Sequence, residues 1–325
     1  MNKKWSLFRM IIWAFIALFL IAYFFKLISG ENLGFNIPII TGSLGGDYEV
    51  ICEKTDNIQG INSIEVSLTS DEVNVINTSD ENIKVVQYSR RELDEDKYVN
   101  LVRDGDKLKI SVPRQGIIYF GFGESVQKFN IYIPEKYNNK LSISHTSGKC
   151  NVDNLTLSEL KLKMTSGKIV ANNIKADDLY SKLTSGQIEI QGEFKNMDVE
   201  ISSGKIVANN IKVDNLKSKV TSGKIEVQGE FKDIEVGVSS GKAEIESVNL
   251  PENLSVEVTS GKCELSLPEN EGFNLKYKRT SGSIKTDFEL ENFDSSNRSG
   301  LAKYKAGGNE WYVKVTSGSV EFDKN

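Results

Sequence analysis

The sequence predicts an all-β protein whose main part is a parallel β-solenoid, preceded by an N-terminal transmembrane helix. Three observations indicate this. A Ser-Gly pair recurs at nearly constant spacing from residue 147 onward. The residues on either side of each pair alternate between apolar and polar, which is typical of strands with one buried face. The first 30 residues contain one long apolar run.

Residues 1–30 have the composition of a membrane anchor. From Met10 to Phe25 the chain reads MIIWAFIALFLIAYFF, and apolar neighbours extend this run to residues 7–28. With the flanking basic side chains snorkelling, about 20 residues cross a hydrocarbon core of ~30 Å. A cleaved signal peptide is the alternative, but its apolar region usually spans ~7–15 residues and ends in small residues. This run ends AYFFKLISGEN, so we expect an uncleaved anchor that contacts membrane lipid through residues 7–28.

The charges around this run predict its orientation. Lys3, Lys4 and Arg9 precede it and only Lys26 directly follows it. Because basic residues stay on the cytoplasmic side, we expect a single-pass cell-membrane protein with a cytoplasmic N-terminus and an extracytoplasmic C-terminal domain. Residues 31–46, ENLGFNIPIITGSLGG, are Gly-rich without periodicity and predict a flexible linker.

Composition excludes some classes of function. The chain has 325 residues and a net charge of −5, and the part after residue 30 carries a net charge of −9. Proteins that bind nucleic acid carry a basic patch, so no nucleic-acid partner is expected. Three cysteines are too few for a disulfide-dense secreted scaffold.

Residues 47–145 predict strands that cap the solenoid. INSIEVSLTSDEVNVINT alternates in polarity, and its TSDEVNV resembles a degenerate first copy of the repeat. Asp104 and Gly105 lie between two alternating runs, which indicates a β-hairpin. VQKFNIYIPEKY predicts a further strand. A cap is expected because the open edge of a first coil would invite aggregation.

Residues 146–325 predict the solenoid repeats, with a C-terminal insertion and terminal strands. The Ser-Gly glycines follow one another at steps of 18–21 residues, at Gly148, Gly167, Gly186, Gly204, Gly223, Gly241, Gly261 and Gly282. Gly318 follows 36 residues later, which we interpret as one coil with an insertion, the path of residues 283–316 being open. The sequence SGKIVANNIK occurs twice, and residues 166–202 are identical to 203–239 at 26 of 37 positions. Such self-similarity predicts stacked units that cannot bury an apolar face alone.

Parallel stacking explains why the same residue types recur at equivalent positions in every copy of the repeat. In an antiparallel sandwich, successive strands reverse, so equivalent residues would not lie side by side. In a parallel solenoid they stack ~4.8 Å apart. Glycine is then expected at the corner with φ > 0. Outward lysines would form one row and glutamates a second beside it, at Lys149, Lys168, Lys205, Lys224, Lys242 and Lys262, and at Glu189, Glu226, Glu244 and Glu264. We interpret a surface of mixed charge mainly as one that keeps the protein soluble.

The TSGKI-type steps, the IYIPEKY strand that enters the array and the closing WYVKVTSGSVEF resemble a bacterial domain-of-unknown-function family labelled "putative adhesin". The resemblance covers roughly residues 47–325. It implies an extracytoplasmic β-solenoid, in some members membrane-anchored and near cell-envelope stress systems. It implies no catalytic residues.

The sequence predicts no catalytic, cofactor-binding or metal site. SGK lacks the spacing of a phosphate-binding loop. His145 is the single histidine, without partners for a triad or zinc site, and is expected to be an exposed strand residue. Cys150 and Cys263 share one phase six coils apart, about 29 Å, which is too far for a disulfide. Asp177 and Asp178, like the acidic residues at 92–96, are interpreted as solvated charges, although some solenoids cleave polysaccharides with carboxylates.

The stretch from Gln115 to Phe129, QGIIYFGFGESVQKF, is aromatic-rich. Packing in the core or cap is one interpretation, and an exposed contact for a partner, the membrane surface or a second copy is the other.

We therefore expect a membrane-anchored, extracytoplasmic, non-catalytic scaffold or adhesin-like protein of the bacterial cell envelope, with a role beside envelope-stress systems as one option. Its partner would be an unidentified envelope protein or glycan. A polysaccharide-acting β-helix enzyme and a polymer-forming, self-associating solenoid are the alternatives.

Overall fold

The computed structural model describes residues 47–113 and 127–325. By their contacts, Met1–Ser43 and Leu44–Asn325 are separate compact units, and all the strands belong to the second. The predicted anchor, residues 7–28, and the linker, 31–46, lie outside the described residues. Within the described ranges, no helix is long and apolar enough to cross a membrane.

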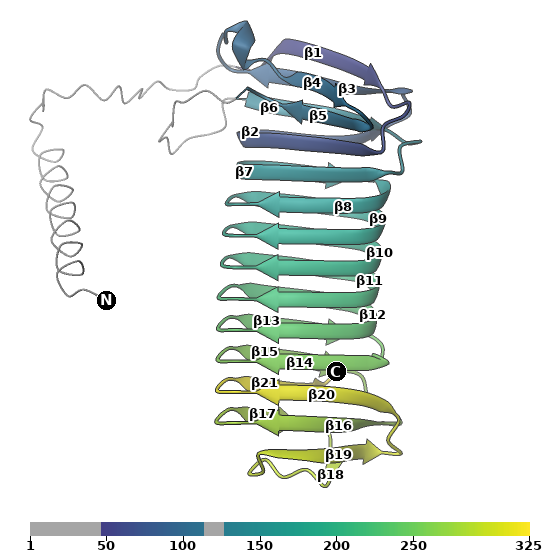
Figure 1. Ribbon diagram of the computed structural model, residues 1–325, viewed down its shortest axis with the longest axis vertical. Helices are drawn as coiled ribbons and strands as arrows, with labels where there is room; N and C mark the ends of the chain where they lie inside the picture. Colours follow the sequence, from purple (N-terminus) through teal and green to yellow (C-terminus); the bar gives the residue numbers. More distant parts are fainter. Residues whose placement is uncertain (1–46, 114–126) are drawn as a thin grey trace, which may run out of the picture. The chain divides into compact units, whose positions relative to one another are not determined.

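The central strands form single coils that stack in parallel, as Figure 1 shows. They are β8 (Thr156–Met164), β9 (Lys168–Leu183), β10 (Gln187–Ile201), β11 (Lys205–Val220) and β12 (Lys224–Val238). Lys168 pairs with Gln187, Gln187 with Lys205 and Lys205 with Lys224, all in parallel register. The predicted all-β fold and its parallel β-solenoid are confirmed.

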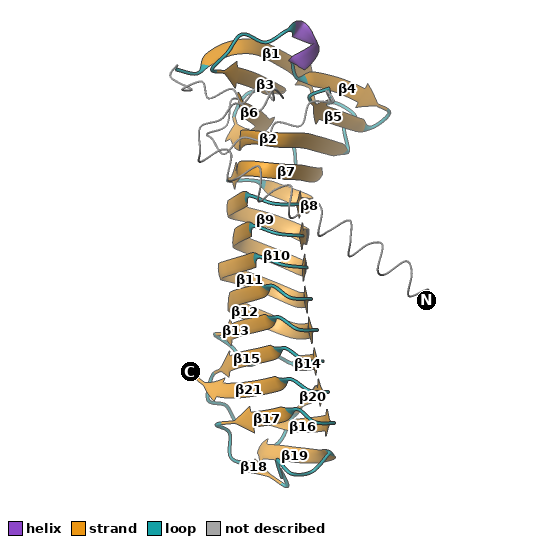
Figure 2. Cartoon of the chain, turned by 90° about the vertical axis from the view of Figure 1, so that its left-hand side faces the viewer, coloured by secondary structure: helices purple, strands orange, loops and turns teal. Residues whose placement is uncertain are grey.

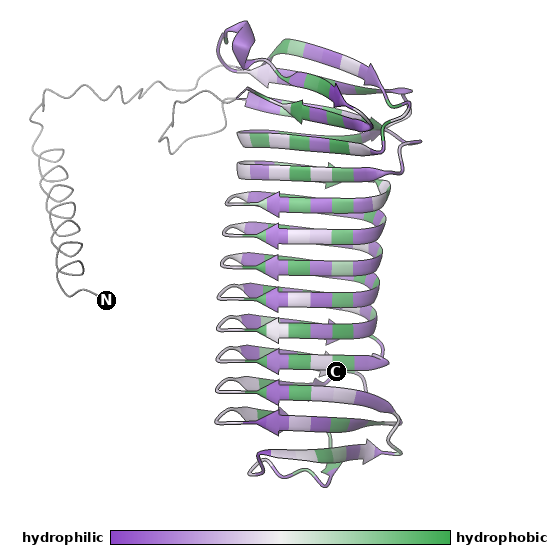
Figure 3. Cartoon of the chain, in the orientation of Figure 1, coloured by the Kyte–Doolittle hydropathy of each residue, from purple (hydrophilic) through white to green (hydrophobic). Residues whose placement is uncertain are grey.

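Identical positions of successive coils stack in the core. One inward column contains Ile169, Ile188, Ile206 and Ile225, each with 0% of its surface exposed. Each branched side chain packs against its counterpart one strand spacing away, so apolar surface is buried continuously along the axis. Figure 3 shows the resulting alternation of apolar and polar positions along the strands.

The Ser-Gly corners need glycine chiefly because neighbouring corners touch. A Cβ on Gly167 would lie 2.3 Å from the carbonyl oxygen of Gly148, and one on Gly261 would lie 2.3 Å from that of Gly241. The predicted positive φ holds for Gly148, Gly167, Gly186 and Gly204 but not for the later corners. What every corner requires is room for the backbone of the neighbouring corner, which a Cβ would block, and not a positive φ.

The opposite corner explains why the repeat is two coils long. In β9 and β11 this corner has an extra residue, with Asn173 and Asn210 in the left-handed region at φ 52°. In β10 and β12 it is one residue shorter, and a Cβ on Gly192 or Gly229 would lie 2.0 Å from an isoleucine carbonyl oxygen of the preceding coil. Asparagine tolerates the left-handed region and glycine allows the close approach. Coils with the two corner types alternate, so the sequence repeats every 37 residues.

The C-terminal coil lies inside the stack. The last regular coils comprise β13 (Lys242–Ser247), β14 (Asn253–Val258) and β15 (Lys262–Leu267). β16 (Gly272–Arg279) and β17 (Ser283–Thr286) do not pair with them, because β20 (Asn309–Val315) and β21 (Ser319–Lys324) insert between. The sequence predicts that the corners at Gly261, Gly282 and Gly318 stack in sequence order, with one inserted loop before Gly318. This prediction is wrong, because Gly318 stacks between the other two.

Antiparallel strands cover both ends of this stack (Figure 2). At the first end, β2 (Ser63–Thr78) lies between β7 (Lys140–Asp153) and the pair β5 (Lys107–Ser111) and β6 (Gln127–Pro134). On these lie β1 (Glu49–Asn57), β3 (Asn82–Ser89) and β4 (Asn100–Asp104), with the short helix η1 (Glu95–Lys97). At the other end, β19 (Ser299–Lys305) runs antiparallel to β16, and β18 (Leu290–Glu291) pairs with β19.

Two details of the predicted first end are confirmed. Asp71 of TSDEVNV pairs with Gly148, so β2 is the degenerate first copy of the repeat. β4 and β5 form the antiparallel hairpin around Gly105, which has φ 61°.

Candidate functional site

The predicted lysine and glutamate rows lie on one broad face of the solenoid, outside strands β9 to β13, β15 and β21, and they neutralise each other. Ion pairs run from coil to coil, with Lys168 Nζ 2.7 Å from Glu189, Lys205 Nζ 2.6 Å from Glu226 and Lys262 Nζ 2.6 Å from Glu321. Each such exposed pair contributes about 0.2–1 kcal/mol. Because the lysines from Lys168 to Lys262 in this row already have carboxylate partners, this face is not the candidate site.

The expectation that His145 is exposed is wrong. It occupies an inward position, aligned with Leu68 of β2 and Met164 of β8, and only 3% of its surface is exposed. Neither ring nitrogen makes a hydrogen bond within the described ranges. Burial lowers the pKa of His145 to about 4, so the ring is neutral at pH 7.

The three cysteines are free thiols, and Cys150 and Cys263 form no disulfide, as predicted. Cys150 and Cys263 are fully buried and lie in the same inward column, six strand pairings apart. Burial raises the pKa of Cys150 to about 12 and also raises that of Cys263, so neither is a reactive thiolate. Cys52 is half-buried.

Asp177 and Asp178, singled out in the sequence, have ordinary partners. Asp177 pairs with Lys195 at 2.6 Å, and Asp178 accepts a hydrogen bond of 2.7 Å from the Asn196 amide. Among the described residues no cluster of His, Cys, Asp and Glu could hold a metal ion. In the aromatic-rich stretch, residues 115–126 lie outside the described residues, and Phe129 is buried in the core.

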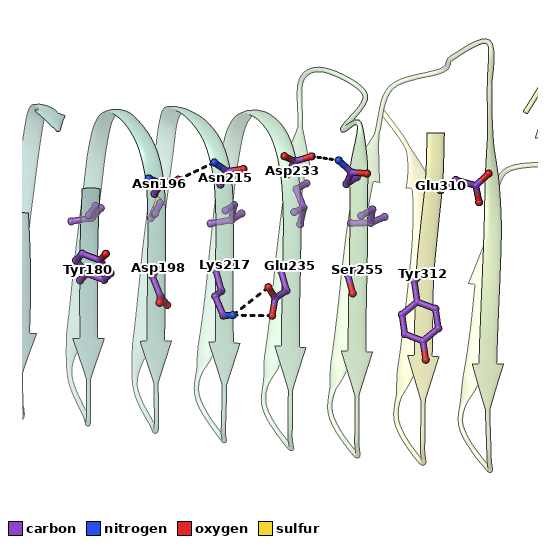
Figure 4. Close-up of a pocket in the computed structure, with 16 residues that line it drawn as sticks. Tyr180, Asn196, Asp198, Asn215, Lys217, Asp233, Glu235, Ser255, Glu310 and Tyr312 are labelled. Carbon is purple, nitrogen blue, oxygen red and sulfur yellow. Dashed lines mark hydrogen bonds and ion pairs between the residues drawn. The ribbon is translucent and has the colours of Figure 1, made fainter. Parts of the chain in front are cut away.

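The second broad face has a trough, which is the candidate site. It runs along the solenoid axis over β9, β10, β11, β12, β14 and β20 and encloses about 570 Å³. One wall is a row of outward side chains, one per strand: Tyr180, Asp198, Lys217, Glu235, Ser255 and Tyr312. The other wall is the row at the adjoining corner: Asn196, Asn215, Asp233, Asn253 and Glu310. Figure 4 shows both rows.

The alternation of inward and outward side chains along each strand determines which residues form these two walls. Leu179, Met197 and Leu216 lie between the two rows in sequence and point into the core. The residues on either side of each of them therefore point outward. Parallel register then repeats each outward position once per coil.

Two runs of side-chain hydrogen bonds hold the corner row, one from Asp178 to Asn215 and one between Asp233 and Asn253. The Asn215 amide donates to the Asn196 side-chain oxygen at 2.8 Å, and Asn253 donates to Asp233 at 2.5 Å. Amide ladders of this kind fix side chains in one orientation along stacked strands. The wall is consequently ordered before any ligand binds.

The opposite row offers unused hydrogen-bonding groups. Lys217 pairs with Glu235 at 3.0 Å, but Asp198, Ser255 and the Tyr312 hydroxyl make no side-chain hydrogen bond or ion pair within the described part of the chain. Burial, followed by repulsion from Glu200, raises the pKa of Asp198. The negative charge of Asp178, followed by burial, raises the pKa of Tyr180.

Sequence reasoning missed this trough because its rows are irregular in composition. The lysine and glutamate rows repeat one residue type, whereas the outward row from Tyr180 to Tyr312 changes residue type at each coil. The available signal was position: Tyr180 and Tyr312 each lie one residue before an inward position of the strand that leads to a Ser-Gly corner.

A family model described as Toastrack DUF4097 matches residues 61–322. The chain belongs to the Toastrack family. The resemblance to a domain-of-unknown-function family is thereby confirmed, and the match includes both β2 and the inserted strand β21 of this Toastrack protein. No curated protein matches the chain.

Solved structures similar to this Toastrack chain include three proteins described as putative adhesins. A "putative adhesin" from Parabacteroides merdae has 16% identity and a TM-score of 0.48, covering 85% of this chain and 97% of its own. One from Bacteroides fragilis has 11% identity and a TM-score of 0.44, covering 84% and 97%. One from Parabacteroides distasonis has 17% identity and a TM-score of 0.41, covering 85% and 98%.

Proposed function

We propose that this Toastrack protein is a non-catalytic, adhesin-like binding protein of the bacterial cell envelope, anchored by residues 7–28 with its solenoid outside the membrane. The observation that carries the proposal is the continuous stacking of the corners from Asp71 to Gly282. It makes one rigid stack that holds a polar trough in fixed geometry. A preorganised surface binds without the entropic cost of ordering loops.

The charge distribution supports the proposed orientation. Lys3, Lys4 and Arg9 precede the apolar run, and only Lys26 directly follows it. Protease added to intact cells should digest the solenoid. Complete protection of the solenoid on intact cells, with digestion after lysis, would contradict this orientation.

Binding is tested with residues 44–325, which form one compact unit by their own contacts. The labelled fragment should bind to bacterial cells or isolated envelopes in a saturable manner, and unlabelled fragment should displace it. The absence of saturable binding would contradict an adhesin-like role. A place beside an envelope-stress system rests on the family resemblance alone and stays a prediction.

The two alternative functions have separate tests. Robust hydrolysis of envelope glycans by the same fragment would replace the binding role with an enzymatic one. For the polymer-forming solenoid, antiparallel strands β1, β4 and β19 cover both ends of the stack and disfavour end-to-end addition. Concentration-dependent oligomers in analytical ultracentrifugation would favour the polymer.

A further inference from the structure

The trough has an aromatic side chain at each end. Tyr180 and Tyr312 occupy the same outward position on β9 and β20, five strand spacings apart. At ~4.8 Å per spacing the two rings are about 24 Å apart along the axis. Tyr180 is 39% exposed, with Lys161 Nζ over one face of its ring, 5.4 Å from the centroid, and Tyr312 is half-buried. The remaining exposed surface of the two rings is available to a ligand. Figure 4 shows them at opposite ends of the polar row.

Between the rings, the trough offers hydrogen-bonding groups at a constant interval. Strands β10, β11, β12, β14 and β20 each contribute one side chain to each wall, and β9 contributes Tyr180 to one of them. Asp198 and Ser255 have no partner among the described residues. Amide, carboxylate and hydroxyl groups together donate and accept hydrogen bonds. A ligand with many hydroxyl groups matches this lining better than an apolar ligand does.

The spacing between successive coils favours some linear polymers over others as ligands of the trough. An extended peptide rises ~3.3 Å per residue and presents side chains to one face at about twice that distance, which does not match the coil spacing. A linear chain of pyranose rings that advances by about one coil spacing, ~4.8 Å, per ring would match the interval. Each ring would then meet side chains at the same positions of successive coils, with a different residue type at each coil in the row from Tyr180 to Tyr312.

The charge of the lining excludes polyanions. Asp198, Asp233, Glu235 and Glu310 are acidic, and Lys217 is the one basic residue among those that line the trough. Because Lys217 is already paired with Glu235, the trough presents a net negative field. Acidic polysaccharides would be repelled.

We propose that the trough between Tyr180 and Tyr312 binds a linear, uncharged polysaccharide, with the two tyrosine rings stacked on sugar faces and the polar walls hydrogen-bonded to hydroxyl groups. The proposal rests on the proposed binding function and assigns its ligand class. Aromatic faces with a few fixed polar groups are the usual composition of such sites.

The test is isothermal titration calorimetry of residues 44–325 with cellohexaose and the hexamer of N-acetylglucosamine, and with hyaluronan as an acidic glycan. At least one neutral hexamer should bind, and hyaluronan should not. The double variant Tyr180→Ala/Tyr312→Ala should bind at least about tenfold more weakly, as expected when anchor residues are removed. Tyr98→Ala, a half-buried tyrosine outside the trough, should bind as the unmodified fragment does.

Circular dichroism should show that the double variant keeps its fold. Binding of neither neutral hexamer would overturn the proposal, as would stronger binding of hyaluronan or of an extended peptide, or neutral-glycan binding that survives the double substitution. Saturable cell binding that the double variant retains would remove the trough as the site while the adhesin-like role remains.

Discussion

Gly318 stacks directly on Gly261, which precedes it by 57 residues, and it separates Gly261 from the next Ser-Gly corner in the sequence, Gly282. The Ser319 N–H donates to the Gly261 carbonyl oxygen at 3.0 Å, and the Ser283 N–H donates to the Gly318 carbonyl oxygen at 3.0 Å. The C-terminal strands thus complete the stack from inside. Since β14 and β16 both pair with β20, the end of the solenoid is assembled only when the last residues of the chain have folded.

We expect Gly318→Ala to destabilise the protein by about 3 kcal/mol, since a buried backbone contact must shift. The new Cβ would lie 2.1 Å from the Gly261 carbonyl oxygen. The matched control is Gly237→Ala, whose Cβ would meet nothing closer than 3.9 Å and which should be neutral or stabilising by up to about 1 kcal/mol. The measurement is denaturant unfolding of residues 44–325, in which buried Trp311 is the single tryptophan and reports directly on the inserted strand. Equal stability of the two variants would contradict the close approach of the corners.

His145 should make stability depend on pH. Its pKa is about 6.5 in the unfolded chain and about 4 in the folded protein, so only the unfolded chain binds a proton between these values. Lowering the pH from 6.5 to 4 therefore destabilises the protein by up to about 3 kcal/mol through this residue. His145→Met, the residue that the next coil has at this position, should remove that part of the pH dependence. The difference in unfolding free energy between the two proteins should be constant above pH 7 and should grow below it. A constant difference down to pH 4 would show that the ring is solvated.

Two buried serines interrupt the apolar core. Ser181 and Ser218 are each 2% exposed, and their hydroxyls make no hydrogen bond within the described ranges. Ser218→Ala should stabilise the protein by roughly 1 kcal/mol, because the folded state no longer desolvates an unpaired hydroxyl. Ser255→Ala, at a half-buried outward position, should change the stability by less than about 0.5 kcal/mol. A destabilised Ser218→Ala would mean that the hydroxyl has a partner in solution.

The alternating corners predict which coils can be removed. Deleting residues 187–223 joins Gly186 to Lys224 and keeps an Asn173-type corner next to a Gly229-type corner. Deleting residues 187–204 removes one coil and places two Asn-type corners in contact. The stability of a stacked repeat protein is approximately the sum of the stabilities of its repeats and of the interfaces between neighbouring repeats. Both deletions lose buried surface, but only the one-coil deletion also creates a mismatched interface, which should destabilise it further. Thermal unfolding should rank the two-coil deletion above the one-coil deletion, and the reverse order would contradict the paired-coil repeat.

The predicted core follows from local pattern alone. Residues such as Ile169 and Ile188 alternate with polar neighbours at a fixed phase, and only parallel stacking buries all of them. The hairpin at Gly105 and the first copy at Asp71 were predictable for the same reason, since each is a short-range signal.

The sequence by itself determined the strand period, the coil length and the inward face, because these depend on contacts between equivalent residues of adjacent copies. Tertiary structure alone decided the position of Gly318, the burial of His145 and the trough. The insertion of β20 pairs strands 57 residues apart, which no local period encodes. His145 has a polar side chain, which predicts exposure, at a strand position that points into the core, which predicts burial. The two signals conflict, and position decided the outcome. The trough joins Tyr180 to Tyr312 only because the inserted strand continues the stack, and one-dimensional spacing could not bring them onto one face.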